Sequence, residues 1–136
     1  MIAPGPVSPG GEEERLVSDP RFQDAVRHFN AGDWYACHDG FEELWHETQG
    51  AMRPVLQGFL QIAVAELHLE RGNRRGATML MGEGLGRLQA CGAVALGIAL
   101  ASLRDCVSER LLALQLEQPL TDLAPPRLEG SGERAQ

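Results

Sequence analysis

The chain has 136 residues, of which 43% are hydrophobic and 23% charged, which is enough for one globular domain with its own core but not for two. All 12 basic residues are arginine, and they stand against 19 acidic residues, which gives a formal net charge of −7. The absence of lysine excludes Schiff-base chemistry and the phosphate-loop lysine of nucleotide hydrolases. The arginines do not gather into a basic face, so we expect no nucleic-acid partner.

The sequence also carries no signal for export or membrane insertion. The first residues lack the basic stretch and apolar stretch of a secretory signal, and the longest weakly polar run, residues 93–101, is too short to cross a bilayer. We therefore expect no membrane partner and a cytoplasmic location. The three cysteines lack a CxxC spacing, which favours reduced thiols over a disulfide framework or a zinc ribbon.

The two ends of the chain differ from its middle in composition. Residues 1–18 and 119–136 are rich in proline, glycine and charge, and we expect them to be disordered, flexible arms. Residues 19–118 between them are expected to form one helical domain. We find no internal repeat, and no alternation of apolar and polar residues that would indicate a strand.

Apolar residues in the middle of the chain recur with helical spacing throughout. The predicted helices cover residues 19–31, 34–49, 52–71, 74–91 and a final stretch from about 100 that ends before Pro119. Glycine follows several of them, and proline or aspartate begins others. The fourth contains four glycines, each of which costs about 1 kcal/mol of helix propensity, and close approach to a neighbouring helix is one use for them. The pattern predicts an all-α fold, a compact bundle of about five helices.

The second predicted helix places polar groups next to its apolar stripe. His38 lies within the stripe, and Glu42 follows one turn later at its edge, so both side chains reach one point in front of the helix. Asp39 projects to the solvent side. The indoles of Trp34 and Trp45 are expected to form the wall of a pocket around this pair or to fill the core.

The third predicted helix carries a polar row made of Gln57, Gln61 and His68, with Glu66 and Glu70 on its opposite edge. Because charged residues are more costly to bury than amides, we expect the glutamates to face water and the row to face inward. Antiparallel packing of the two helices then predicts one inward polar cluster, consisting of His38, Glu42, Gln57, Gln61 and His68.

Two interpretations of this cluster remain open. As a metal site, His38, Glu42 and His68 form a ligand set suited to a divalent zinc, iron or manganese ion, with positions left for water or substrate. The two glutamines would then contact substrate or support the ligands. As a structural network, the same groups satisfy one another by hydrogen bonds and fix the register of the helices without a metal. From the sequence we favour the network.

A second candidate site is the turn between the third and fourth predicted helices. Arg71, Asn73 and Arg74 surround backbone N–H groups at the start of a helix, where cations oppose the helix dipole. A bound phosphate or carboxylate would offset that cost and use the N–H donors. The alternative is that Arg71 stabilises the end of the preceding helix while Arg74 points to solvent or to a carboxylate.

Several separately spaced motifs resemble those of the bacterial and archaeal family known as domain of unknown function 309. They are Phe29-Asn30-Ala31-Gly32, Trp34-Tyr35, His38-Asp39-x-x-Glu42-x-x-Trp45, Gln57-Gly58-x-x-Gln61, His68 and Arg71-Gly72-Asn73-x-x-Gly76-Ala77. The resemblance covers about residues 22–91 and implies a small, all-helical cytosolic protein without an established activity. The family pattern has His-Glu where this chain has His38-Asp39.

These observations leave two classes of function. The first is a non-catalytic module that self-associates as a homo-oligomer or binds a small anionic ligand or another protein, with the cluster as a structural network or a binding site. The second is a metal-dependent, hydrolase-like enzyme that uses His38, Glu42 and His68, with Arg71 binding an anionic group. An open cleft beside His38 would favour the enzyme.

Overall fold

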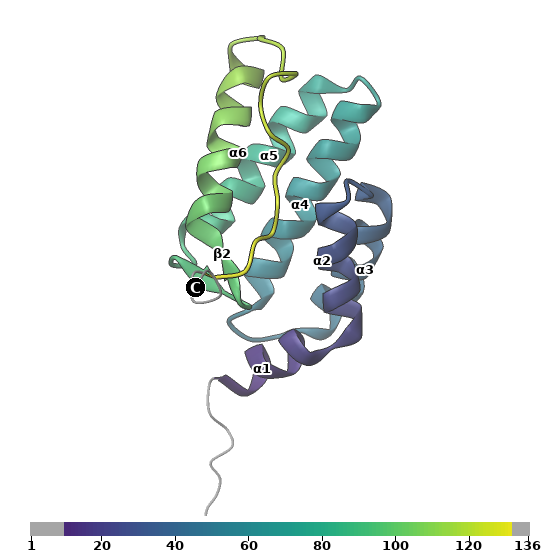
Figure 1. Ribbon diagram of the computed structural model, residues 1–136, viewed down its shortest axis with the longest axis vertical. Helices are drawn as coiled ribbons and strands as arrows, with labels where there is room; N and C mark the ends of the chain where they lie inside the picture. Colours follow the sequence, from purple (N-terminus) through teal and green to yellow (C-terminus); the bar gives the residue numbers. More distant parts are fainter. Residues whose placement is uncertain (1–9, 132–136) are drawn as a thin grey trace, which may run out of the picture.

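From residue 20 onward, consecutive helices of this chain fold back on one another, and the first described helix lies across one end of the bundle (Figure 1). The computed structural model describes residues 10–131. Its elements are α1 (Gly10–Ser18), α2 (Pro20–Asn30), α3 (Trp34–Glu47), α4 (Arg53–Glu70), α5 (Arg74–Gln89), β1 (Val94–Ala95), β2 (Ile98–Ala99) and α6 (Leu100–Gln115). The five predicted helices are α2 to α6, and the all-α class is confirmed. The short antiparallel pair β1–β2, in the predicted connection before α6, was not expected.

The hairpin turns are built from the signals expected in the sequence. In the turn between α2 and α3, Gly32 has a positive φ of 77° and Asp33 accepts a hydrogen bond from the Ala36 amide. In the turn between α4 and α5, Gly72 has a φ of 78° and Asn73 accepts from the Gly76 amide at 2.9 Å. Each glycine takes the left-handed conformation that ends a helix, and each polar residue caps the next helix.

The close contact predicted for the glycine-rich helix occurs between α4 and α5. A Cβ atom at Gly84 would lie 3.1 Å from the carbonyl oxygen of Gly58, and one at Gly58 would lie 2.7 Å from the Leu88 side chain. Gly82 has open space around it. Glycine is therefore required at the crossing point of the two backbones and not at every position of α5.

The expectation that residues 1–18 form an arm outside the domain is wrong for residues 10–18, whereas residues 1–9 lie outside the described residues. Helix α1 buries Leu16, and both carboxylate oxygens of Glu12 accept backbone hydrogen bonds, from Gly50 at 2.8 Å and Met52 at 2.9 Å. The neighbouring Glu13 accepts from the Leu96 amide at 2.6 Å. Composition missed this helix because carboxylates, not apolar residues, hold most of it in place.

The expectation that residues 119–136 form a flexible arm is likewise wrong for residues 119–131. The chain after α6 runs back along the bundle between α6 and α2 (Figure 1), and Leu128 is only 2% exposed. The Leu128 backbone is hydrogen-bonded to the side chain of Asn30 on α2. An extended segment with few buried side chains has no hydrophobic period, so the sequence pattern does not predict its packing. Residues 132–136 lie outside the described residues. Among the described helices, none combines the length and apolar character required to cross a membrane.

Candidate functional site

Three polar side chains gather on the outer face of α3, within one turn of each other. The Nδ1 atom of His38 lies 3.2 Å from a carboxylate oxygen of Asp39, and its Nε2 atom lies 3.9 Å from a carboxylate oxygen of Glu42. The His38 side chain is 26% exposed and that of Glu42 is 46% exposed. The ring of Tyr35, one turn earlier, stacks on the imidazole at 6.2 Å between centroids. The imidazole is thus positioned from three sides.

This arrangement gives the two nitrogens of His38 different roles. Nδ1 is in hydrogen-bond contact with Asp39, and the ring tautomer with the proton on Nδ1 would leave the Nε2 lone pair for a cation on the side of Glu42. A carboxylate behind a histidine is the usual device that orients a metal-binding imidazole and increases its basicity. Among the described residues, His38, Asp39 and Glu42 are the only group of three potential ligands within 4.8 Å of one another. His38 and Glu42 could hold a cation, with Asp39 supporting the ring.

The predicted inward cluster is not one network in the structure. Gln61 is hydrogen-bonded to two residues of α5, donating to Glu83 at 3.0 Å and accepting from Arg87 at 2.9 Å. His68 accepts a hydrogen bond from the Asn73 side-chain amide at 3.3 Å, and it is not part of the group on α3. Gln57 is partly buried. The spacing within α3 correctly predicts that His38 and Glu42 lie together. Which side chains of α3 and α4 contact each other depends on how the two helices pack, and a helical wheel of one helix does not contain that information.

The expectation that Glu66 faces water is wrong. Glu66 is 4% exposed and makes a two-pronged ion pair with Arg110 of α6, with N–O distances of 2.7 and 2.6 Å. Burial raises the pKa of Glu66 above its ordinary value, and the guanidinium of Arg110 partly opposes that change. Glu70 is exposed as expected. The prediction failed because the counter-charge comes from a distant helix, which the pattern of α4 alone does not contain.

The two tryptophans occupy different places. Trp34 is buried edge to face against Phe29, with 5.0 Å between ring centroids, so it fills the core, and it also lines a cleft together with Leu69 and Arg110. Trp45 follows Glu42 by three residues, and the guanidinium of Arg53 lies over its ring at 4.1 Å. The indole Nε1 of Trp45 is buried and has no hydrogen-bond partner within the described part of the chain. Burial of an unsatisfied donor costs about 1–3 kcal/mol of folding free energy. This donor is on α3, the helix that carries His38 and Glu42.

The predicted anion site is largely occupied by contacts within the chain. Asn73 caps α5, and the guanidinium of Arg74 donates to the backbone carbonyl of Gln118 at 2.8 Å. Arg71 is exposed at the end of α4. The geometry thus explains Asn73 and Arg74 as structural residues, and Arg71 stays a predicted anion contact.

Comparison with known proteins shows what this helical core is similar to. Residues 22–80 match the model of DUF309, a domain of unknown function. The predicted resemblance to the DUF309 family is confirmed. The chain is also 41% identical over 59 residues to "Uncharacterized protein YpuF" of Bacillus subtilis (strain 168). That alignment covers 43% of this chain and 34% of the relative, so the chain spans about a third of that protein's length.

The DUF309 match contains the whole group on α3, together with α4 and the first part of α5. Helices α1 and α6 and the C-terminal segment lie outside it. Helix α6 supplies Arg110, the partner of the buried Glu66, which lies within the matched residues. A buried charge within the matched residues is therefore neutralised by a residue outside the match.

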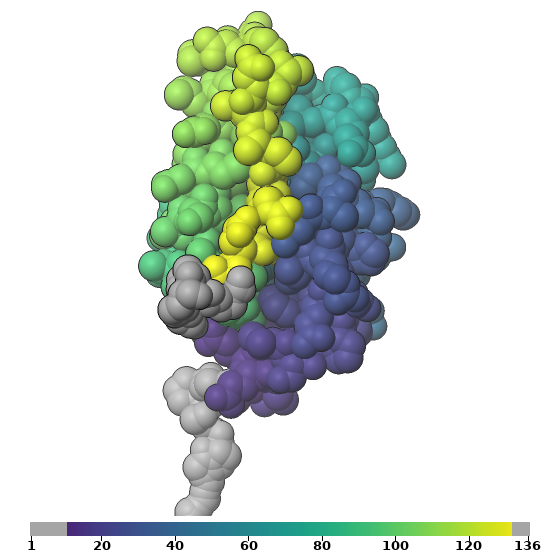
Figure 2. Space-filling view, viewed as in Figure 1, coloured from purple at the N-terminus to yellow at the C-terminus, as the bar shows by residue number. Residues whose placement is uncertain are grey.

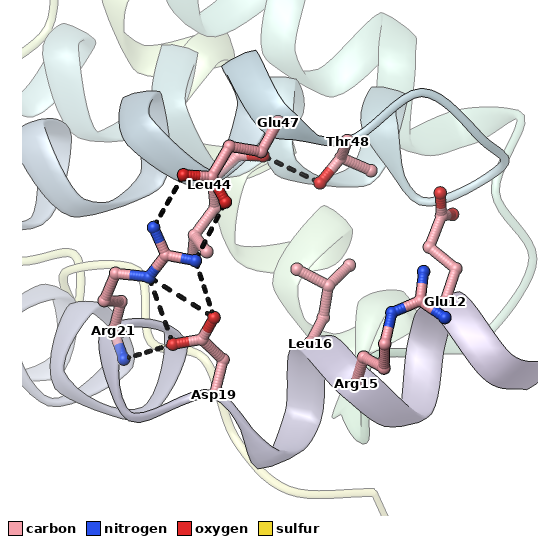
Figure 3. Close-up of a pocket in the computed structure, with 8 residues that line it drawn as sticks. All are labelled: Glu12, Arg15, Leu16, Asp19, Arg21, Leu44, Glu47 and Thr48. Atoms are coloured by element: carbon pink, nitrogen blue, oxygen red, sulfur yellow. Dashed lines mark hydrogen bonds and ion pairs between the residues drawn. The ribbon is translucent and has the colours of Figure 1, made fainter.

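A cluster of charges that the sequence analysis did not single out lies between α1, α2 and α3. The guanidinium of Arg21 binds the carboxylates of Asp19, Glu43 and Glu47. Figure 3 shows its contacts with Asp19 and Glu47. Hydrogen bonds from the Arg21 guanidinium, and to a lesser extent its charge, lower the pKa of Asp19 and of Glu47 below their ordinary values. A cavity of about 210 Å³ adjoins this cluster, and Glu12 of α1 also lines it. The spacing of Glu43 and Glu47 one turn apart on α3 is the sequence signal that could have revealed it.

Proposed function

We propose that this chain is a non-catalytic binding module in which His38 and Glu42 hold a divalent cation of the zinc, iron or manganese type. The observation that carries the proposal is the double contact of the His38 imidazole, with Asp39 at Nδ1 and Glu42 near Nε2. Nitrogen and carboxylate oxygen are ligands that suit these metals. The partial exposure of both side chains leaves the remaining coordination positions to water or to a group on a partner.

Binding rather than turnover is supported by the hydrogen bond of His68, the third ligand that the enzyme would need. The α1 cavity and the cleft at Arg110 are lined by residues other than His38 and Glu42. The alternative proposal, a metal-dependent hydrolase with His38, Glu42 and His68 as ligands, needs His68 to leave Asn73 and approach α3. Because His68 is hydrogen-bonded to Asn73 and lies outside the group on α3, the binding module requires less rearrangement.

The remaining expectations from the sequence belong to the same proposal. They are a cytoplasmic location, no nucleic-acid or membrane partner, and either self-association or a small anionic ligand. The net charge of −7 supports the exclusion of nucleic acid, because a polyanion would be repelled. The exposed Arg71 supports an anionic ligand at the end of α4.

Titration calorimetry with zinc chloride and with manganese chloride tests the cation site. The wild-type chain should bind one ion, and His38→Ala should lose it while the helical circular dichroism spectrum is retained. His46→Ala is the matched control, because His46 is an exposed histidine on the same helix outside the group. Asp39→Asn should weaken binding by about 10- to 100-fold, as expected for loss of a supporting carboxylate. Equal binding by wild type and His38→Ala would refute the proposal.

A further inference from the structure

The segment after α6 lies as an extended chain in a furrow of the bundle. Figure 2 shows this segment, residues 119–131, filling the furrow between α6 and the N-terminal helices. We call it the tail segment. It follows a turn in which Glu117 has a positive φ of 57°, and it makes no helix. Its hold on the domain therefore depends on contacts along an extended backbone.

Side chains of the bundle bind the backbone of the tail segment. The amide of Asn30 donates to the Leu128 carbonyl at 3.0 Å and accepts from the Leu128 N–H at 2.7 Å, so it pairs with one residue as a neighbouring strand would. The guanidinium of Arg110 donates to the carbonyls of Leu123 and Ala124 at 3.4 and 3.1 Å. Contacts of this kind do not depend on the side chains of the bound segment.

The strand β2 adds a second backbone contact further along. The Ala99 amide donates to the Glu129 carbonyl at 2.9 Å, and the Ser131 amide donates to the Gly97 carbonyl at 2.9 Å. Ile98 and Gly130 form an antiparallel bridge. Addition of a strand to an exposed sheet edge is a recurring mode of peptide recognition. The furrow thus holds an extended peptide by two known modes at once.

Two apolar side chains of the tail segment are buried. Leu128 is 2% exposed and Pro126 is buried, whereas Pro125, Arg127 and Glu129 are exposed. The guanidinium of Arg127 also donates to the Asn30 carbonyl at 3.2 Å. Two consecutive prolines fix φ and favour an extended conformation before binding, which reduces the entropy lost on docking. The buried pattern is a proline followed two residues later by a leucine.

The tail segment does not fill the space available to it. On one side, a cleft of about 680 Å³ is lined by Trp34, Leu69, Arg110 and, from the tail segment, Leu120 and Pro125. On the other side lies a cleft of about 510 Å³, which is lined in part by Ala99, Cys106, Ala124 and Arg127. A segment with larger side chains at the positions of Ala124 and Pro125 would bury more surface in the same furrow.

We propose that this furrow is a binding groove for an extended proline–leucine segment of a partner protein, and that the tail segment is its intramolecular occupant. The tail segment can leave without unfolding a helix, because it begins after α6 has ended. Release exposes Asn30, Arg110 and the edge of β2 to the incoming segment. This site is separate from the cation site on α3.

The test uses the full-length chain and a fluorescein-labelled peptide with the sequence of residues 119–131, measured by fluorescence anisotropy. Wild type should bind weakly, because its own tail competes at an effective concentration in the millimolar range. Leu128→Asp detaches the tail, since a carboxylate is not buried there without a partner. This variant should bind the peptide about 10-fold more tightly or better. Adding Asn30→Ala should abolish the gain, and Leu112→Asp, at an exposed leucine of α6, should behave as wild type.

Three results would overturn the proposal. The first is a folded Leu128→Asp variant, with unchanged circular dichroism and melting temperature, that binds the peptide no better than wild type. The second is loss of the fold in this variant, which would make the tail segment a part of the core. The third is a concentration-dependent dimer of the wild type that excludes the labelled peptide, which would assign the groove to a second copy of the chain.

Hydrogen exchange of the Asn30→Ala variant is an independent test, because this variant, unlike Leu128→Asp, places no charge at a buried position. Amides of residues 119–131 should exchange faster in this variant, while those of α4 and α5 keep their protection. Unchanged exchange in the tail segment, or faster exchange in the whole domain, would contradict a releasable occupant.

Discussion

The buried ion pair between α4 and α6 gives the sharpest test of the packing. Glu66 and Arg110 are 4% and 6% exposed, and their two hydrogen bonds measure 2.7 and 2.6 Å. Glu66→Gln removes the negative charge and leaves the guanidinium of Arg110 buried without a counter-charge. Breaking one partner of a buried pair costs about 3–5 kcal/mol, and we expect the free energy of unfolding to fall by that amount.

A double-variant cycle separates the pair from its surroundings. The single variants of the cycle are Glu66→Leu and Arg110→Met, and each should cost about as much as Glu66→Gln. Arg110→Met loses in addition about 0.5–1.5 kcal/mol for each hydrogen bond to the tail carbonyls. The combination Glu66→Leu with Arg110→Met removes both charges and fills the space with apolar atoms, so it should cost only about 1–2 kcal/mol. The two residues would then show a coupling of several kcal/mol.

Urea unfolding followed by circular dichroism measures these free energies. Glu70→Gln is the matched control, because Glu70 is exposed one turn later on the same helix, and it should change stability by less than about 0.5 kcal/mol. A loss below about 1 kcal/mol for Glu66→Gln, or a double variant as unstable as the sum of the single variants, would refute the reasoning.

Three further predictions follow from the helix contacts. Gly84→Ala should destabilise the fold by about 1–3 kcal/mol because its Cβ meets the α4 backbone, whereas Gly82→Ala should stabilise it by about 0.4–1 kcal/mol; thermal unfolding distinguishes the two signs. Glu12→Ala should cost about 1–3 kcal/mol in urea unfolding because two backbone amides lose a charged acceptor, and no loss would show that α1 is not held by this carboxylate. Hydrogen bonds from Arg21 lower the pKa of Asp19. The contact between the two residues therefore stabilises the fold above the ordinary aspartate pKa of about 4, and this stabilisation is lost as the pH falls through the lowered pKa. Arg21→Gln should therefore flatten the loss of stability below about pH 4, and an unchanged acid limb would contradict this assignment.

Much of the fold follows from local signals in the sequence. The glycines at 32 and 72 and the capping residues Asp33 and Asn73 fix the ends of four helices through backbone conformation and short-range hydrogen bonds. The pairing of His38 with Glu42 was likewise predictable, because it depends only on the geometry of one helix.

The parts that the sequence did not reveal depend on partners far along the chain. Glu12 of α1 accepts a hydrogen bond from the turn between α3 and α4, and Asn30 of α2 binds the tail segment. Neither α1 nor the tail segment therefore needs a hydrophobic pattern of its own. The orientation of α4 was misjudged because the guanidinium of Arg110 lowers the cost of burying Glu66. A helical wheel counts the cost of charge burial without knowing which counter-charge another helix provides.

The most direct test of the cation proposal is elemental analysis by mass spectrometry of untagged protein purified without chelator. The account predicts near-stoichiometric zinc, iron or manganese in wild type and in His46→Ala, and its loss in His38→Ala with the fold retained. The same metal content in His38→Ala as in wild type, or none in wild type, would contradict it.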